Sequence, residues 1–368
     1  MSQRNMEIIK FKVCVSCMTY NHSAFIEDAM NGFCMQRTNF PFVCTIVDDA
    51  STDNEQEVIT NYLQKNFLLE DKNYSRFEET NDYTLIFSRH NSNPNCFFSV
   101  LFLKENHYKK KSKLAYLKEW RSNVKYIALC EGDDYWITTD KLQCQVDFLD
   151  NHPNYTMVCN RVKIFSECHK KFIGEYYCYD HSQTVDPKDI IRRTGLFIST
   201  CSIVHRREIS ENKPDYWLQC KVGDYPLQIM CAMKGKVFYF DNIMSVYRRG
   251  YSTSWSGLRF RGTCSIQKFE TIMSQVLMFE GFGKDFPEFN EVFQDKIFDH
   301  IDRNIPSRRL LSKTDLNFYL NYFSDIIKSY SIRGKIDLLI RKSRIPGLRF
   351  FYRLIFMEKY SVRTLMYT

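Results

Sequence analysis

Three acidic residues follow directly after a short apolar run in the middle of the chain. The run, Tyr126–Cys130, predicts a buried strand, and Glu131, Asp133 and Asp134 come at its carboxyl end. In open α/β sheets, ligands bind at that edge. Adjacent carboxylates repel each other, so a fold that keeps them usually supplies a cation or a donor-rich ligand. Sparse oxygen ligands of this kind suit Mg²⁺ or Mn²⁺ that also contacts a phosphate. The alternative is a solvated acidic turn with Trp136 packed behind it.

A second apolar run ends in carboxylates in the same way. Phe42–Val47 has the composition of a strand and is followed by Asp48 and Asp49. Upstream, Val13–Met18 predicts another strand, which turns at Tyr20 into an amphipathic helix. Strands and helices that alternate over short connections indicate a parallel sheet. Both acidic strand ends should therefore lie at one edge of that sheet, with the tyrosine on the turn between them.

These segments resemble the family-two glycosyltransferases with the GT-A fold, of the kind that builds bacterial surface polysaccharides. Val15–Asn21 is similar to the opening strand and turn of that family, Ile46–Asp53 to the hallmark after the second strand, and Tyr126–Trp136 to the acidic DxD motif. All three occur in the family's order and spacing. The resemblance implies an α/β fold with a mostly parallel, Rossmann-like sheet flanked by helices. It also implies a hexosyltransferase that works in cell-envelope polysaccharide biosynthesis.

The resemblance implies a role for each acidic strand end. Asp134, with Asp133 beside it, would hold Mn²⁺ or Mg²⁺ against both phosphates of a nucleotide-diphosphate sugar, with a UDP-sugar as the expected donor. One of the two carboxylates could bind the ribose instead. Asp49 would accept a hydrogen bond from the base or ribose, and Tyr20 would stack on the base. The implied nucleotide-binding residues are Tyr20, Asn21, Asp48, Asp49 and Asp133.

A further carboxylate and two arginines complete the predicted site. Asp224 opens a predicted helix and by itself reads as an N-terminal cap. The resemblance implies that it is the general base, although a glycine replaces the glutamate that usually precedes it. Tyr247–Trp255 resembles the segment that closes over the diphosphate, and Arg248 and Arg249 are its predicted diphosphate contacts. Many relatives carry a histidine near the position of Gly250, so a third metal ligand is not expected there.

The expected reaction is a single displacement with inversion at the anomeric carbon, as the resemblance implies. The acceptor would be a hydroxyl of a glycan or of a lipid-linked saccharide. A sugar nucleotidyltransferase is disfavoured because Met18–Ser23 lacks the glycines that cradle a triphosphate. The remaining alternative is a catalytically impaired protein that binds sugar nucleotides on the same scaffold.

The length of 368 residues predicts a transferase domain at 1–258 and a helical region at 259–368. Short strands are predicted at 237–241 and 245–249, and helices at 288–302 and 314–329. The 14 cysteines are scattered and read as free thiols. Since Met1–Lys10 is too polar for a secretory signal, a cytoplasmic protein is expected. The apolar stretch Phe97–Leu103 is too short to span a bilayer.

Most of the net positive charge falls at the C-terminal end. Residues 331–368 carry nine lysines and arginines against two acidic residues, which is +7 of the chain's formal +8. Within them, Leu348–Met357 mixes large apolar and basic side chains, a pattern that suits an anionic membrane surface. The protein would then be peripheral on the inner face of the membrane. A terminal helix packed on its own domain explains the pattern equally well. Nucleic-acid binding is not expected, because no recognised motif accompanies the charge.

Overall fold

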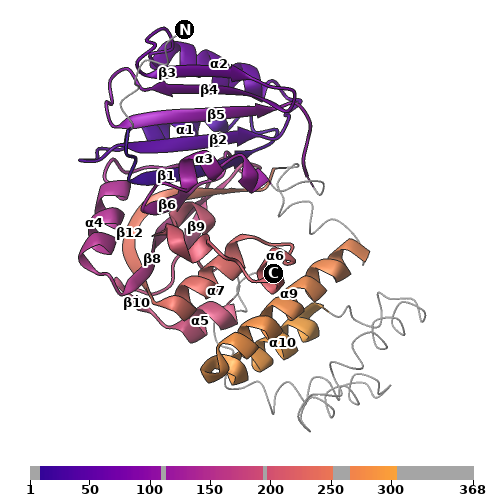
Figure 1. Cartoon of the computed structure of the whole chain (residues 1–368). Coiled ribbons are helices and arrows are strands. Elements are labelled where there is room, and N and C mark those ends of the chain that lie inside the picture. The colour runs from indigo at the N-terminus through magenta and orange to yellow at the C-terminus, as the bar shows by residue number, and fades with distance from the viewer. Residues whose placement is uncertain (1–8, 109–112, 194–196, 252–265, 305–368) are drawn as a thin grey trace. The chain divides into compact units, whose positions relative to one another are not determined.

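A computed structural model describes residues 9–108, 113–193, 197–251 and 266–304 of the chain (Figure 1). The strands are β1 (Val13–Thr19), β2 (Phe42–Asp48), β3 (Ser75–Glu79), β4 (Tyr83–Arg89), β5 (Cys96–Leu103), β6 (Tyr126–Leu129), β7 (Tyr135–Trp136), β8 (Tyr155–Ser166), β9 (Lys171–Tyr176), β10 (Gln183–Val185), β11 (Val204–Arg206) and β12 (Lys236–Arg249). The α-helices are α1 (Ile26–Cys34), α2 (Glu55–Asn66), α3 (Lys118–Arg121), α4 (Lys141–Asn151), α5 (Pro187–Arg193), α6 (Asp215–Leu218), α7 (Asp224–Lys234), α9 (Ile266–Asp285) and α10 (Asn290–Asn304).

The strands form one mixed sheet with a parallel centre. Its order is β10-β12-β8-β11-β6-β1-β2-β5-β4-β3, with β7 paired to β12 and β9 paired to β8. Strands β6, β1, β2 and β5 run parallel to one another, whereas β11 is antiparallel to β6, β4 to β5 and β3 to β4. The predicted α/β fold with a Rossmann-like sheet flanked by helices is therefore confirmed. The parallel pairing predicted for most of the sheet holds at its centre, and the outer strands make the whole sheet mixed. Because β6, β1 and β2 are adjacent and parallel, their carboxyl ends meet at one edge.

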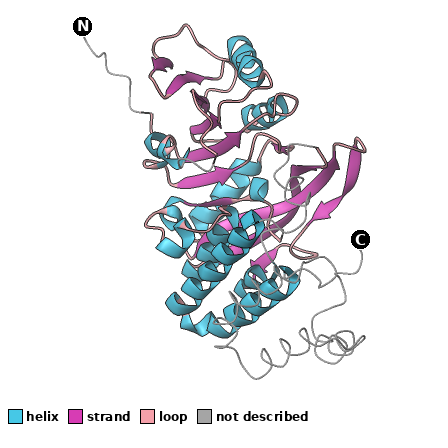
Figure 2. Ribbon diagram, turned by 90° about the vertical axis from the view of Figure 1, so that its right-hand side faces the viewer, coloured by secondary structure: helices cyan, strands magenta, loops and turns pink. Residues whose placement is uncertain are grey.

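The central strands bury both of their faces. Alternate residues of β1, β2, β5 and β6 contribute to a large core shared with α1, α2 and α4, and the residues between them to smaller clusters on the opposite face. Figure 2 shows helices on both sides of this part of the sheet. Cys14 and Cys17 lie on opposite faces, and the cysteines of the described residues are free thiols.

The apolar stretch at 97–103 belongs to β5, every residue of which is buried. Among the described residues, no helix is long and apolar enough to cross a membrane.

One long strand replaces two predicted ones. β12 runs through both 237–241 and 245–249, with irregular register against β8 between Phe240 and Ser245. Such irregularities bend a strand without ending its pairing, which an apolar pattern alone does not reveal. The predicted helix at 288–302 corresponds to α10. The predicted boundary near 258, the helix at 314–329 and the basic segment at 331–368 lie outside the described residues.

Candidate active site

The acidic segments at the ends of β6 and β2 are both hydrogen-bonded to the end of β1. The backbone N–H of Gly132 donates to Met18 O at 3.0 Å, and that of Asp49 donates to Thr19 O at 3.0 Å. A Cβ atom on Gly132 would lie well inside van der Waals contact with the Thr19 side chain. Glycine is therefore what allows the acidic turn after β6 to approach β1 so closely.

Burial and the charge of Asp133 raise the pKa values of Glu131 and Asp134 on this turn. The pKa of Glu131 rises to about 8, first through burial and then through the charge of Asp133; Lys113 opposes the shift and Asp224 adds to it. Burial, followed by the charge of Asp133, also raises the pKa of Asp134 well above its usual value. The Arg248 backbone N–H partly offsets this by donating to Asp134 Oδ1 at 3.0 Å.

These carboxylates are chemically suited to a divalent cation. Asp133 and Asp134 present adjacent carboxylate oxygens. The charge of Asp133 disfavours the ionised form of Asp134, and a bound cation would reverse that effect. Within the described part of the chain, no three His, Cys, Asp or Glu side chains are arranged as a metal site. Two carboxylates would leave most of the coordination of Mn²⁺ or Mg²⁺ to other ligands, and the binding of either ion here stays a prediction.

Tyr251 covers the acidic turn, a contact that the sequence did not predict. Its hydroxyl donates to Asp133 Oδ2, and its ring packs 4.9 Å from the Phe25 ring and 6.1 Å from the His22 ring. Burial and the neighbouring Asp133 both raise the pKa of this tyrosine. The only sequence signal was that it falls in the segment resembling a diphosphate cover.

Asp49 is buried between two donors at the end of β2. Its Oδ1 accepts from the His107 backbone N–H at 2.7 Å, and its Oδ2 pairs with Lys113 Nζ at 2.8 Å. Lys113 therefore links Asp49 electrostatically to Glu131, although it lies far from both in sequence. Tyr20, on the turn after β1, is 41% exposed and open to stacking.

Asp48 and Asn21 brace the loops around this site. Asp48 Oδ2 accepts from the Ser51 backbone N–H at 3.2 Å and from Gln56 Nε2 at 2.5 Å, and burial raises the pKa of Asp48. Asn21 has a left-handed backbone (φ 57°), and its Oδ1 accepts from the Thr52 backbone N–H at 2.8 Å. These contacts join the loops after β1 and β2. Direct nucleotide binding by Asp48 and Asn21 stays a prediction.

Arg248 is buried in ion pairs. Its guanidinium donates to Glu167 Oε1 at 2.6 Å and to Asp28, and it stacks 4.7 Å from the Tyr135 ring. Arg249 donates to the Tyr176 hydroxyl at 3.3 Å. The predicted diphosphate contacts of both arginines remain predictions. For Arg248 such a contact would require exchanging its exposed partner, Asp28, for the phosphate.

Asp224 opens α7 and combines two features. Its Oδ1 accepts from the Tyr225 backbone N–H at 2.8 Å, as a helix-terminal carboxylate does, and its Oδ2 accepts from Thr200 Oγ1 at 3.1 Å. Its charge also raises the pKa of Glu131, so it lies within electrostatic reach of the acidic turn. The fold thus brings this carboxylate to the cluster from a distant part of the sequence.

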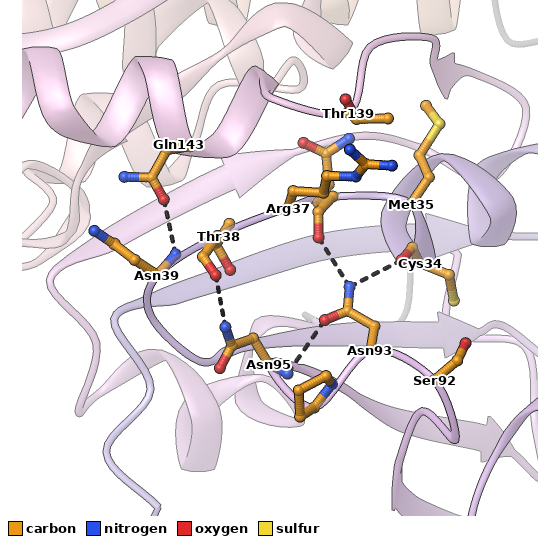
Figure 3. Close-up of a pocket in the computed structure, with 12 residues that line it drawn as sticks. Cys34, Met35, Arg37, Thr38, Asn39, Ser92, Asn93, Asn95, Thr139 and Gln143 are labelled. Carbon is orange, nitrogen blue, oxygen red and sulfur yellow. Dashed lines mark hydrogen bonds between the residues drawn. The ribbon is translucent and has the colours of Figure 1, made fainter.

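A separate cavity of about 640 Å³ lies at the opposite edge of the sheet, before β2 and β5 (Figure 3). Several of its amides already have internal partners. Asn93 Nδ2 donates to Cys34 O and Gln36 O, and Asn95 Nδ2 donates to Thr38 O at 2.6 Å. These bonds hold the loops before β2 and β5 together, so this cavity is not part of the site at the carboxyl ends.

Comparisons with known proteins agree with this architecture. No family model matches the chain. Uncharacterized proteins of Mycobacterium bovis and Mycobacterium tuberculosis are 29% identical to it over 241 residues. The match covers 65% of this chain and 59% of the length of those curated relatives.

Among solved structures, S. aureus TarS 1–349 in complex with UDP-GlcNAc is similar, with a TM-score of 0.62 and 14% identity over 88% of this chain and 83% of that one. A longer TarS chain gives a TM-score of 0.56 at 15% identity, covering 95% of this chain and 54% of that one. At such low identity the likeness shows the fold: the chain has the GT-A-like fold of these glycosyltransferases, as the three motifs predicted.

We expect Asp134→Asn to stabilise the metal-free protein. The raised pKa of Asp134 means that its ionised form costs free energy in the folded state, and asparagine can still accept the Arg248 N–H. The melting temperature in EDTA should rise at pH 8 by about 2–4 °C for each kcal/mol gained. A raised carboxyl pKa destabilises the fold increasingly as pH rises from the unfolded value, so the gain should shrink towards pH 5. Asp147→Asn, at an exposed position of α4, is the control. An equal rise in melting temperature in Asp147→Asn, or no rise in Asp134→Asn, would contradict the conclusion that ionised Asp134 destabilises the fold.

We also expect Gly132→Ala to damage the site while Gly223→Ala does not. The added methyl group at 132 would force Thr19 or the acidic turn to move, at a cost of about 1–3 kcal/mol. At 223 nothing lies within 4 Å of the added atom. Urea unfolding measures the free energy of unfolding of both variants. Equal values would show that the contact between the acidic turn and β1 adjusts to the added methyl group at little cost.

Proposed function

We propose that the protein is a metal-dependent glycosyltransferase of family two that transfers a hexosyl group from a nucleotide-diphosphate sugar to a glycan or lipid-linked hydroxyl. The observation that carries the proposal is the set of carboxylates gathered by a GT-A-like fold. Glu131, Asp133 and Asp134 share one turn, Asp224 lies within electrostatic reach of it, and Asp49 is linked to it through Lys113. A UDP-sugar is the proposed donor because TarS, which shares the fold, was solved with UDP-GlcNAc.

Each part of the site would perform one task. Asp133 and Asp134 would hold Mn²⁺ or Mg²⁺, which offsets the negative charge of the departing nucleoside diphosphate when it is bound. Tyr20 would stack on the base, and Asp49, held by Lys113, would accept from the base or ribose. Tyr251, whose hydroxyl donates to Asp133, would orient this carboxylate toward the cation.

Asp224 would accept the proton of the acceptor hydroxyl. Thr200 holds one of its oxygens, which restricts the rotation of the carboxylate, and the start of α7 favours its negative charge. Attack from the face opposite the departing diphosphate gives inversion. We place the reaction in the cytoplasm, free or at the inner face of the membrane, where a lipid-linked acceptor in surface-polysaccharide synthesis would be found.

Asp134→Ala should abolish the metal dependence of nucleotide binding. The diphosphate charge loses its bridge to the protein, so calorimetric titration of UDP should give the same weak affinity with Mn²⁺ as with EDTA. Asp147→Ala, which removes an exposed carboxylate, should behave like the wild type. A fully Mn²⁺-dependent affinity in the Asp134 variant would refute the metal assignment.

Asp224→Asn should separate donor binding from transfer. Asparagine keeps the shape and can still accept from Thr200, but it cannot take a proton, so transfer should fall by about 10²-fold or more. UDP release in the presence of acceptor measures transfer, and UDP-sugar titration measures binding. Near-normal transfer would mean that Asp224 is only a helix cap. Metal-dependent donor binding with no release from any sugar nucleotide in the wild type would instead favour the catalytically impaired binding protein.

A further inference from the structure

The hairpin between β8 and β9 carries an unusual run of exposed residues. All seven positions from Cys168 to Gly174 are exposed, and among them Phe172 and Ile173 are 51% and 49% exposed. Large apolar side chains are rarely left in water side by side at the end of a hairpin, so such a pair suggests a binding surface.

A bulge in the pairing explains why two apolar neighbours are both presented. The register passes from Ile164↔Gly174 to Phe165↔Phe172, so Ile173 has no partner on β8. Phe172 is supported from beneath by the Phe165 ring at 5.3 Å, and Lys163 Nζ lies 5.3 Å above its ring. Phe172 is therefore held in place by contacts with Phe165 and Lys163, and Ile173 lies next to it at the bulge.

The charge around this pair is positive. Lys170 and Lys171 precede Phe172, and the run from Cys168 to Gly174 contains no carboxylate. The two flanking carboxylates have basic partners: Glu167 is buried against Arg248 and also pairs with Lys170, and Glu175 pairs with Arg161 at 2.7 Å. The hairpin thus presents an apolar tip with lysines around it.

We propose that this hairpin, residues 168–174, docks the protein on an anionic phospholipid surface. Phe172 and Ile173 would enter the interface between headgroups and acyl chains, and Lys163 and Lys171 would meet the lipid phosphates, while Lys170 stays paired with Glu167. A soluble polyanion would use the lysines but leave the apolar pair exposed. A second copy of the chain docking through the same patch would bring like charges together. An anionic membrane accounts for both the exposed apolar pair and the lysines beside it.

The hairpin also adjoins the candidate active site. β8 ends at Ser166, which pairs with Arg249, and the preceding residue Arg248 donates its backbone N–H to Asp134. Docking at the hairpin would therefore bring the carboxylate cluster close to the membrane surface. The inference does not depend on the proposed function, because it concerns binding alone.

The test measures partition of the full-length protein onto sedimented vesicles of phosphatidylcholine with about one third phosphatidylglycerol, at low and high salt. Two double variants remove one feature each: Phe172→Ser with Ile173→Ser, and Lys163→Gln with Lys171→Gln, which leaves the pair of Lys170 with Glu167 intact. The matched control is Phe77→Ser, since Phe77 is 66% exposed on β3 at the far end of the sheet. Melting temperatures check that every variant is folded.

We expect each double variant to lose vesicle partition by about tenfold or more, the Phe77 variant to bind like the wild type, and salt to weaken binding. The proposal is overturned if the double variants bind vesicles as the wild type does, or if the wild type binds none. The membrane proposal is also overturned if the apolar variant changes only the dimerisation of the protein, because the patch then binds a second copy of the chain. It is overturned as well if the lysine variant loses only heparin binding, because the patch then binds a soluble polyanion.

Discussion

The mutual repulsion of the carboxylates after β6 is the constraint on which the site depends. Glu131, Asp133 and Asp134 stand within four residues, and burial makes the ionised forms of Glu131 and Asp134 still less favourable. A turn with no further role would be more stable with neutral side chains in place of these carboxylates. Instead the surrounding structure supplies partial compensation through a backbone N–H from Arg248 and the charge of Lys113. Such incomplete compensation is typical of a site that a cation or ligand completes.

Arg248 connects this constraint to the rest of the fold. Its guanidinium ties α1, through Asp28, to the turn after β8, through Glu167, while its backbone holds Asp134. Buried ion pairs of this kind add little net stability compared with apolar packing, and their better-supported contribution is to specify one arrangement. In this protein the specified arrangement is the position of the end of β12 over the acidic turn, from which Tyr251 reaches Asp133.

The two halves of the site come from different parts of the sheet. The parallel strands β1, β2 and β5 place Tyr20, Asp49 and the loop that carries His107 on one side. The elements that follow β6 provide Asp224, Thr200 and the end of β12 on the other. A nucleotide on the first side and an acceptor on the second would meet over the acidic turn, which belongs to the strand between them.

Local pattern was enough to predict the acidic edge. Apolar runs that end in carboxylates, alternating with amphipathic helices, indicate parallel strands, and parallel neighbours must place their carboxyl ends together. Asp48, Asp49, Asp133 and Asp134 could therefore be located from the sequence alone. The motif resemblance added Asp224, which by its local signal is a helix cap.

Only the tertiary structure decided which partner each of these groups meets. Lys113 reaches Asp49, Tyr251 reaches Asp133, and Arg248 is buried against Glu167 and Asp28 rather than exposed. These contacts join residues far apart in the chain, and loop paths and a bulged strand set them, which no periodicity encodes. The same holds for Phe172 and Ile173: the register shift of β9 against β8 separates their pairing, and both side chains are exposed.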